Sequence, residues 1–66
     1  MQNTLPALRQ DRGWSQQRLA DELGVSRQTI ISIERGRFDP SLPLAFRIAR
    51  LFETSIEHVF EPDDAE

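Results

Sequence analysis

The side chains best suited to chemistry lie on one side of a short helical pattern over residues 26–35. At about 100° per residue, the side opposite Ile30 and Ile33 carries a mostly polar set: Gln28, Ile31, Ser32 and Arg35, with Arg27 flanking it. An arginine fork and a carboxamide each present two hydrogen-bonding groups in one plane. Such groups suit the recognition of flat edges and anions better than the making or breaking of covalent bonds.

Nothing elsewhere in the sequence favours catalysis. His58 is the only histidine, and no glycine-rich phosphate loop, paired metal ligands or nucleophile motif is present. Asp21–Glu22 and Asp63–Asp64 are sequence neighbours, so a helix would point the two side chains of each pair about 100° apart, unlike an acid–base pair. The lack of cysteine excludes disulfides and thiolate metal sites. We therefore expect no catalytic residue, no metal and no cofactor.

Two helices are expected to position the polar side, over residues 16–23 and 27–35. Ser15 and Ser26 precede them, and each serine oxygen can cap a helix by accepting a free backbone N–H. Gly24 and Gly36 fall where these helices should end, and glycine accepts the left-handed conformation needed there. Two helices that stop and restart within a few residues, with glycine at the break, are typical of a helix-turn-helix.

The run from Ser15 to Gly36 is S-Q-x-x-L-A-x-x-L-G-V-S-R-Q-T-I-x-x-I-E-x-G, and P-S-L follows at positions 40–42. This pattern closely resembles the Cro/C1 repressor-type (XRE) helix-turn-helix family, and the resemblance extends from about Leu8 to Phe60. It implies an all-α fold, a five-helix lambda-repressor-like DNA-binding domain whose helices 2 and 3 form the helix-turn-helix. The second helix of the motif would then enter the major groove of DNA.

Contacts to DNA bases are expected from the N-terminal part of that second helix, because this end of a recognition helix meets the base edges. The candidates are Arg27, Gln28 and Ser32. Arginine can bind guanine O6 and N7, and glutamine can bind adenine N6 and N7, each pair discriminating by about 1–3 kcal/mol. Ile31 could pack on a thymine methyl or could be a single exposed apolar side chain, which is the simpler interpretation.

Contacts to the DNA backbone are expected from a second group: Gln16, Ser26, Thr29, Arg35 and Arg37. The resemblance assigns Gln16, at the start of the first motif helix, to a phosphate. Arg35 and Arg37 match family positions that contact the DNA backbone. Ser26 and Thr29 could contact phosphate or could serve only as cap and first-turn residues, and the sequence leaves both interpretations open.

Arg9 and Glu34 match an arginine–glutamate pair of the family that ties helix 1 to the end of the recognition helix. Glu34 lies close to the apolar face, which fits a partly covered carboxylate that needs a cation. The alternative is that both are solvated surface charges, and their spacing alone does not exclude it.

The first helix is expected to begin at Pro6, in the N1 position, because proline disfavours helical geometry at Leu5. Ala7 and Leu8 can then face the core.

The remaining elements complete a single domain over residues 1–66. The first helix and the last two are expected over residues 6–12, 42–52 and 56–60, and an acidic tail over residues 61–66. Ser41 and Ser55 can cap the last two helices. No strand pattern is visible, so the chain reads as helices with short connections.

The charge is divided unevenly along the chain, although the net charge is only −3. Residues 1–52 carry eight arginines against five acids, a balance of +3, whereas residues 53–66 carry six acids and no arginine, a balance of −6. The body is therefore mildly basic, which suits binding to double-stranded DNA. The acidic tail could reduce non-specific DNA binding or contact a partner, and a solvated terminus is the simpler interpretation.

Phe46 and Leu51 fall outside the apolar stripe of the fourth helix, and Phe38 lies in the linker before it. Exposed apolar side chains of this size suggest a partner surface, unless the short helices leave room for them to fold inward. The family usually binds palindromic DNA as a two-fold dimer, so the resemblance implies a homodimer, with Phe46 and Leu51 as its candidate surface.

Together these patterns predict a sequence-specific transcriptional regulator, a repressor acting as a dimer on a palindromic operator. The first residues have neither a charged lead nor a long apolar run, so no signal peptide or membrane span is expected and a cytoplasmic location fits. The alternative is an antitoxin-like subunit that mainly binds another protein and also regulates its own operator.

Overall fold

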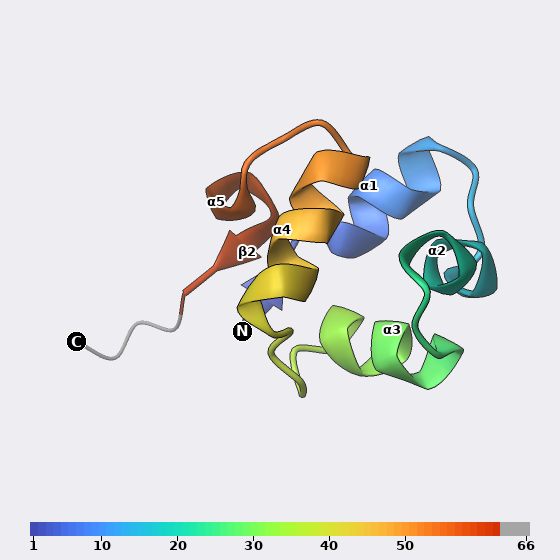
Figure 1. Cartoon of the computed structure of the whole chain (residues 1–66), viewed down its shortest axis with the longest axis horizontal. Helices are drawn as coiled ribbons and strands as arrows, with labels where there is room; N and C mark the ends of the chain where they lie inside the picture. The colour runs from blue at the N-terminus through green and yellow to red at the C-terminus, as the bar shows by residue number, and fades with distance from the viewer. Residues whose placement is uncertain (63–66) are drawn as a thin grey trace.

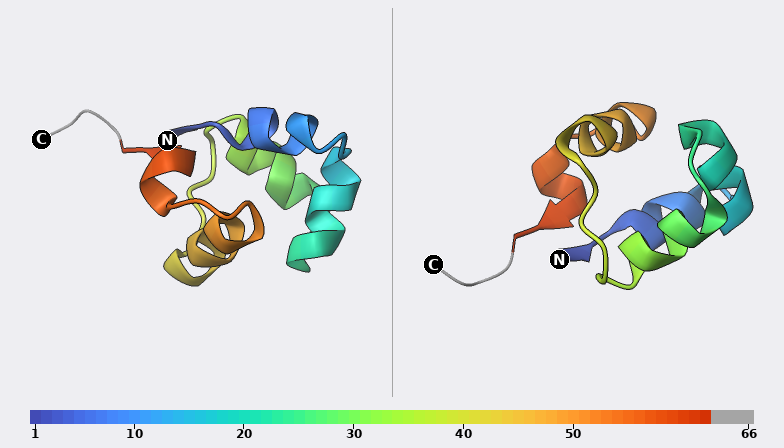
Figure 2. Two further views of the ribbon diagram at one scale, coloured as in Figure 1. Left: turned by 90° about the horizontal axis from the view of Figure 1, so that it is seen from above. Right: turned by 60° about the horizontal axis from the view of Figure 1, so that its bottom comes forward.

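The computed structural model describes residues 1–62, in which helices and a two-stranded sheet are arranged as Figure 1 shows. In chain order the elements are β1 (Gln2–Asn3), α1 (Leu5–Asp11), α2 (Gln16–Leu23), α3 (Arg27–Glu34), α4 (Leu42–Leu51), α5 (Ile56–Val59) and β2 (Phe60–Glu61). All five expected helices are present. Helices α2 and α3 form one end of the molecule, and α5 and β2 lie at the opposite end (Figures 1 and 2).

The two-stranded sheet contradicts the expectation that the chain has no strand. Asn3 of β1 pairs with Phe60 of β2 in antiparallel register, and the Thr4 N–H continues the pairing by donating to the Val59 carbonyl at 2.8 Å. Each strand is only two residues long, too short to show an alternating pattern in the sequence. Glu61, expected in the acidic tail, is therefore part of the fold, and residues 63–66 of that tail lie outside the described residues.

Helix α1 begins at Leu5, so the prediction that Pro6 occupies its first position is wrong. Leu5 is fully buried, and its N–H donates to the Asn3 side-chain oxygen at 3.1 Å. This burial and capping outweigh the local steric preference that proline imposes on the residue before it. Ala7 is exposed rather than in the core, whereas Leu8 is partly buried against it, because a start at Leu5 turns Leu5 inward instead.

The core gathers apolar side chains from every helix and from β2: Leu5, Leu19, Ala20, Leu23, Ile30, Ile33, Leu44, Ala45, Ile48, Phe52, Val59 and Phe60. Burying one leucine or isoleucine side chain of this kind contributes about 1.5–3 kcal/mol. Ile30 and Ile33 are the contribution of α3. Their burial fixes which side of α3 faces outward.

The turn between α2 and α3 is built as the sequence indicates. The Ser15 and Ser26 hydroxyls accept from the backbone N–H three residues later, at 3.0 and 3.1 Å. Gly24 ends α2 with φ +70°, in the left-handed region. Arg47 of α4 donates from Nη2 to the Leu23 carbonyl at this end of α2, so its side chain connects the two helices.

The last two helices differ in how they are capped. The Ser41 hydroxyl accepts from the Leu44 N–H at 3.3 Å, as expected. The Ser55 hydroxyl makes no such bond to α5 and lies 2.7 Å from His58 Nδ1 instead, so its predicted capping role is wrong. The Ser55 hydroxyl therefore interacts with the His58 imidazole and not with a free backbone N–H of α5. None of the helices within residues 1–62 has the length and apolar character needed to cross a bilayer.

Candidate nucleic-acid interface

The residues expected to contact bases lie on the side of α3 that faces away from the core. Arg27 and Gln28 are exposed in its first turn, and Ser32 is half-buried one turn later. Within residues 1–62 the side chains of all three make no hydrogen bond or ion pair with the rest of the chain. Ile31 on the same side is half-buried. The first turn of α3 thus presents two unoccupied planar polar groups to solvent.

The arginines divide into two groups by what they contact. Four are engaged by other groups of the chain: Arg9, Arg12, Arg18 and Arg47. Three others flank α3, with Arg27 in its first turn and Arg35 and Arg37 just after its end. Within the described residues these three have no carboxylate or hydrogen-bond partner. Arg50 on α4 also has no such partner in the described residues, so three of the four arginines without one lie around α3, and this suits a polyanion.

The loop after α3 folds back onto its last turn and holds Arg37 there. The N–H groups of Arg37 and Phe38 both donate to the Ser32 carbonyl, at 3.0 and 3.3 Å. Gly36 permits this reversal with φ +75°. Arg35 and Arg37 consequently lie close to the end of α3. This is the position that the predicted contacts to the DNA backbone need.

Arg9 of α1 and Glu34 of α3 form an ion pair. Arg9 Nε donates to Glu34 Oε2 at 2.8 Å and Nη2 donates to Oε1 at 3.2 Å. The side chains are only 12% and 6% exposed, so they are not solvated surface charges. Gln16 joins them by donating from Nε2 to Glu34 Oε1 at 3.1 Å. The sequence assigns Gln16 only to phosphate, whereas the structure also gives it an internal hydrogen bond that fixes its side chain.

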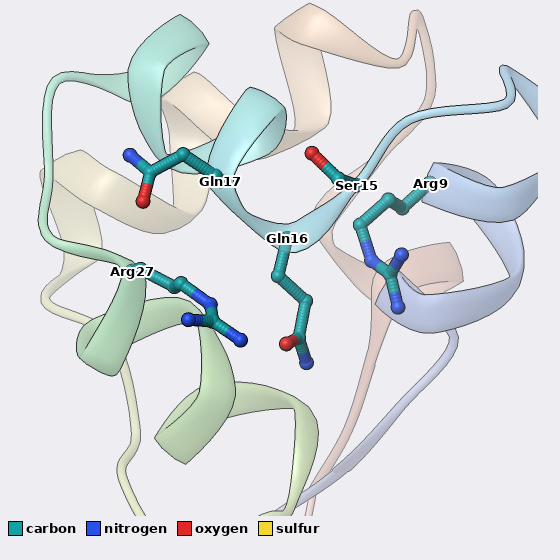
Figure 3. A pocket seen from close by; sticks show the side chains of 5 residues that line it. All are labelled: Arg9, Ser15, Gln16, Gln17 and Arg27. Atoms are coloured by element: carbon teal, nitrogen blue, oxygen red, sulfur yellow. The ribbon is translucent and has the colours of Figure 1, made fainter.

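A shallow hollow lies beside this network, at the start of α2. Its lining residues are Arg9, Ser15, Gln16, Gln17 and Arg27. Figure 3 shows the amide of Gln16 between the guanidinium groups of Arg27 and Arg9. A helix N-terminus favours anions through its free N–H groups, and here an unpaired arginine from α3 lies beside it. The sequence does not predict Gln17 at this site, because only its place in the first turn of α2 distinguishes it.

Ser26 and Thr29 act together as a cap. The Ser26 hydroxyl accepts from the Thr29 N–H at 3.1 Å, and the two hydroxyl oxygens lie 2.9 Å apart. The capping interpretation of Ser26 is therefore confirmed. A phosphate contact from either residue stays a prediction.

A cation–π cluster that the sequence does not predict fastens the loop between α1 and α2. The Arg12 guanidinium lies 5.0 Å from the Trp14 ring centroid and 4.7 Å from that of Phe52. Arg18 lies 4.9 Å from the Trp14 ring as well. Exposed contacts of this kind contribute about 0.5–1 kcal/mol each. They hold the start of α2 against the end of α4.

Large apolar side chains are exposed on α4 and on the linker before it. Phe38, Leu42 and Phe46 are 48%, 63% and 47% exposed. Leu51, predicted alongside Phe46 as part of a dimer surface, is partly buried against the core. Leu42 is missing from that prediction, although it lies one turn before Phe46 and so shares its side of the helix.

Comparison with known proteins identifies the family. The helix-turn-helix family model HTH_3 matches residues 7–59. An uncharacterized HTH-type transcriptional regulator of Methanocaldococcus jannaschii is 52% identical over 66 residues, which cover the whole of both chains. The uncharacterized HTH-type transcriptional regulator YgzD of Bacillus subtilis is 43% identical over 60 residues, which cover 91% of each chain.

A solved structure shows the same fold. The crystal structure of the hypothetical transcription factor NHTF from Neisseria superposes with a TM-score of 0.74 and 26% sequence identity. The match covers 82% of this chain and 61% of that one, so the chain spans less than two thirds of that protein. The matched family and these relatives are helix-turn-helix regulators rather than enzymes. The chain therefore belongs to the Cro/C1-type (XRE) helix-turn-helix family and is a transcriptional regulator with a helix-turn-helix DNA-binding domain.

Proposed function

We propose that the protein is a sequence-specific repressor that binds double-stranded DNA as a two-fold dimer in the cytoplasm. The observation that carries the proposal is the concentration of exposed, unpartnered arginines around α3, with Arg27 in its first turn and Arg35 and Arg37 just after its end. A duplex placed against the outward side of α3 would meet the first turn of this helix with its major groove. The relatives named above come from archaea and bacteria, whose DNA lies in the cytoplasm.

The side chains around α3 divide into two roles in this proposal. Arg27, Gln28 and Ser32 read base edges, since they occupy the exposed N-terminal part of the helix. Arg35 and Arg37 neutralise phosphates and fix the register of the protein on the duplex. Gln16, held in place by Glu34 at 3.1 Å, sits where a further phosphate could meet the N-terminus of α2. Repression then follows simply from occupying promoter DNA.

The proposed dimer uses the exposed surface of α4. A groove beside Phe46 is lined by Ala49, Ile56, Arg50 and Glu57, among other residues. Arg50 and Glu57 have opposite charges and no partner in the described part of the chain. In a two-fold interface the same surface is used on both copies, so if one residue contacts a second residue across the interface, the reverse contact is also made. Arg50 of one copy can therefore pair with Glu57 of the other, which makes this groove self-complementary.

The exposed apolar side chains of α4 and of the linker before it also fit the alternative function, an antitoxin-like subunit. In that case Phe38, Leu42 and Phe46, exposed by roughly half or more, would be covered by a different protein. The two functions differ in what the purified chain does alone. A repressor forms its own dimer, whereas an antitoxin-like subunit would need its partner to cover these side chains.

Selection from a library of random duplexes tests the proposed function. The purified protein should enrich an inverted repeat whose half-site centres lie about 34 Å apart, one helical turn of DNA. Light scattering on the same sample should give the mass of a dimer. An enriched pool with no common sequence would contradict sequence-specific binding, and a single half-site bound by a monomer would contradict the two-fold dimer.

A further inference from the structure

The N-terminal segment reaches the end of the recognition helix at two points. The Met1 ammonium donates to the Gly36 carbonyl just after α3 at 3.2 Å, and the Asn3 side chain contacts α3 itself. Asn3 Nδ2 donates to the Ile33 carbonyl at 2.8 Å, while Asn3 Oδ1 accepts from the Leu5 N–H at 3.1 Å. One carboxamide therefore bridges the start of α1 and the last turn of α3. Thirty residues separate Asn3 from Ile33 in the sequence, so this contact exists only in the folded chain.

Asn3 is itself held in place by the backbone on either side of it. It pairs with Phe60 in the β1–β2 ribbon. The next residue, Thr4, donates from its N–H to the Val59 carbonyl at 2.8 Å and from its hydroxyl to the His58 carbonyl at 3.0 Å. The Asn3 side chain thus extends from a fixed part of the fold and does not simply follow α3.

The acceptor, the Ile33 carbonyl, lies in the last turn of α3. The last carbonyls of a helix lack intrahelical partners, and Ile33 precedes Glu34, the final residue of α3. The Ile33 carbonyl also accepts from the Gly36 N–H at 2.9 Å. Asn3 and Arg9 therefore hold adjacent residues of α3, one through the backbone of Ile33 and the other through the side chain of Glu34.

Two attachments at neighbouring positions resist rotation of α3 about its own axis better than one does. Ser32 lies on this last turn, on the outward side, so a rotation there would turn it away from the base edges of a bound duplex. Base recognition tolerates little misplacement, because bidentate hydrogen bonds to base edges need both atoms in position. Phosphate attraction is far less sensitive to such a rotation.

We infer that Asn3 is a positioning residue for DNA recognition. It restrains the last turn of α3 by binding the Ile33 carbonyl, within the orientation that the buried Ile30 and Ile33 set, and so preserves sequence preference rather than general DNA affinity. This inference rests on the proposed sequence-specific binding by α3. No contact between Asn3 and DNA is involved.

The test variant is Asn3→Asp, which keeps the oxygen that accepts from Leu5 but replaces the donor to Ile33 with an acceptor. Gln2→Glu is the charge-matched control, because Gln2 is exposed on the same strand and its side chain has no hydrogen bond in the described residues. Thr4→Val is the control for ribbon stability, because it removes the bond to His58 without touching α3. All three are compared under conditions in which circular dichroism shows them folded.

Two readouts are measured. In the free protein, amide hydrogen exchange at Gly36 should be faster in Asn3→Asp than in either control, because the last turn of α3 has lost its anchor. On DNA, the ratio of affinities for the selected duplex and for an unrelated duplex should fall by about tenfold in Asn3→Asp, the equivalent of about 1.4 kcal/mol. Both controls should retain the wild-type ratio.

The outcomes separate the two claims. Wild-type protein without preference for any duplex would overturn the proposed function, whatever the variants do. Unchanged Gly36 exchange in Asn3→Asp would overturn the positioning role on its own, because that readout needs no DNA. A wild-type affinity ratio in Asn3→Asp, or an equal loss in Thr4→Val, would also overturn the positioning role while leaving the proposed function intact.

Discussion

Glu34 at the end of α3 accepts two hydrogen bonds from the Arg9 guanidinium of α1, at 2.8 and 3.2 Å. The pair is almost completely covered, and it connects the recognition helix to the first helix of the chain. Arg9 also donates from Nη1 to the Trp14 carbonyl at 2.9 Å. Arg9 of α1 therefore connects its own helix both to α3 and to the loop between α1 and α2.

Removing one member of this pair should be strongly destabilising. Arg9→Ala leaves the Glu34 carboxylate without its cation, which should lower the free energy of unfolding by about 3–5 kcal/mol. That is most of the stability that a chain of 66 residues is expected to have. Urea denaturation followed by circular dichroism measures the change.

The matched control is Glu22→Ala, which removes the exposed i,i+4 partner of Arg18. Its cost should be about 0.5 kcal/mol or less. The double variant Arg9→Met/Glu34→Leu should recover much of the lost stability, because no unpaired charge remains. Equal small losses in Arg9→Ala and Glu22→Ala would show that the covered pair has no special weight.

The sequence predicts this pair only through the family resemblance, since spacing alone does not exclude two solvated charges. The burial that decides between the alternatives depends on residues distant in sequence, because Glu34 accepts hydrogen bonds from both Arg9 of α1 and Gln16 of α2. Leu5 illustrates the same limit. Local sterics place the helix start at Pro6, and the core overrides this by burying Leu5.

Arg47 should contribute to stability although the sequence gives it no role. Arg47→Ala removes the charged donor to the Leu23 carbonyl at the end of α2, and hydrogen bonds to charged groups contribute about 1.5–3 kcal/mol. Thermal or urea unfolding should show a loss of about that size. Arg50→Ala on the same helix, which has no partner in residues 1–62, should change stability by about 0.5 kcal/mol or less at monomeric concentrations. Losses of the same size in both variants would argue against a specific role for Arg47.

The two proposed roles around α3 should separate in the salt dependence of binding. Arg35→Ala or Arg37→Ala should weaken binding to all duplexes and reduce the slope of log K against log salt by about 0.9 for each lost phosphate contact. Arg27→Ala or Gln28→Ala should instead lose about 1–3 kcal/mol of discrimination at particular base pairs. Affinity titrations at several salt concentrations measure both effects. If all four variants weakened every duplex equally, the division of roles would be wrong.

Phe46 should be needed for self-association. Phe46→Ser removes an aromatic side chain that is about half exposed on α4, so it should shift the protein toward monomer while the unfolding transition changes little. Sedimentation velocity over a range of concentrations gives the dissociation constant. Gln28→Ala, which alters an exposed side chain of α3 and no residue of the groove, serves as the control. A Phe46→Ser protein that dimerises as tightly as wild type would place the interface elsewhere.

Those features of the fold that depend on local signals follow from the sequence. Caps at Ser15 and Ser26, the glycine at Gly24 and the buried stripe of α3 are each encoded within a few neighbouring residues. The β1–β2 ribbon and the Asn3 bridge are not, because the ribbon joins the two ends of the described chain and the bridge joins residues thirty apart. Two-residue strands also carry no periodicity from which they could be recognised.

The most direct test of the central claim is a titration of ¹⁵N-labelled protein with its selected duplex, followed by amide chemical shifts. We expect the largest shifts over residues 26–32 and at the start of α2, with small changes on α5. Shifts confined to α4 and α5, with α3 unaffected, would contradict the claim that the outward side of α3 binds DNA. A folded sample whose spectrum no duplex changes at low salt would contradict it as well.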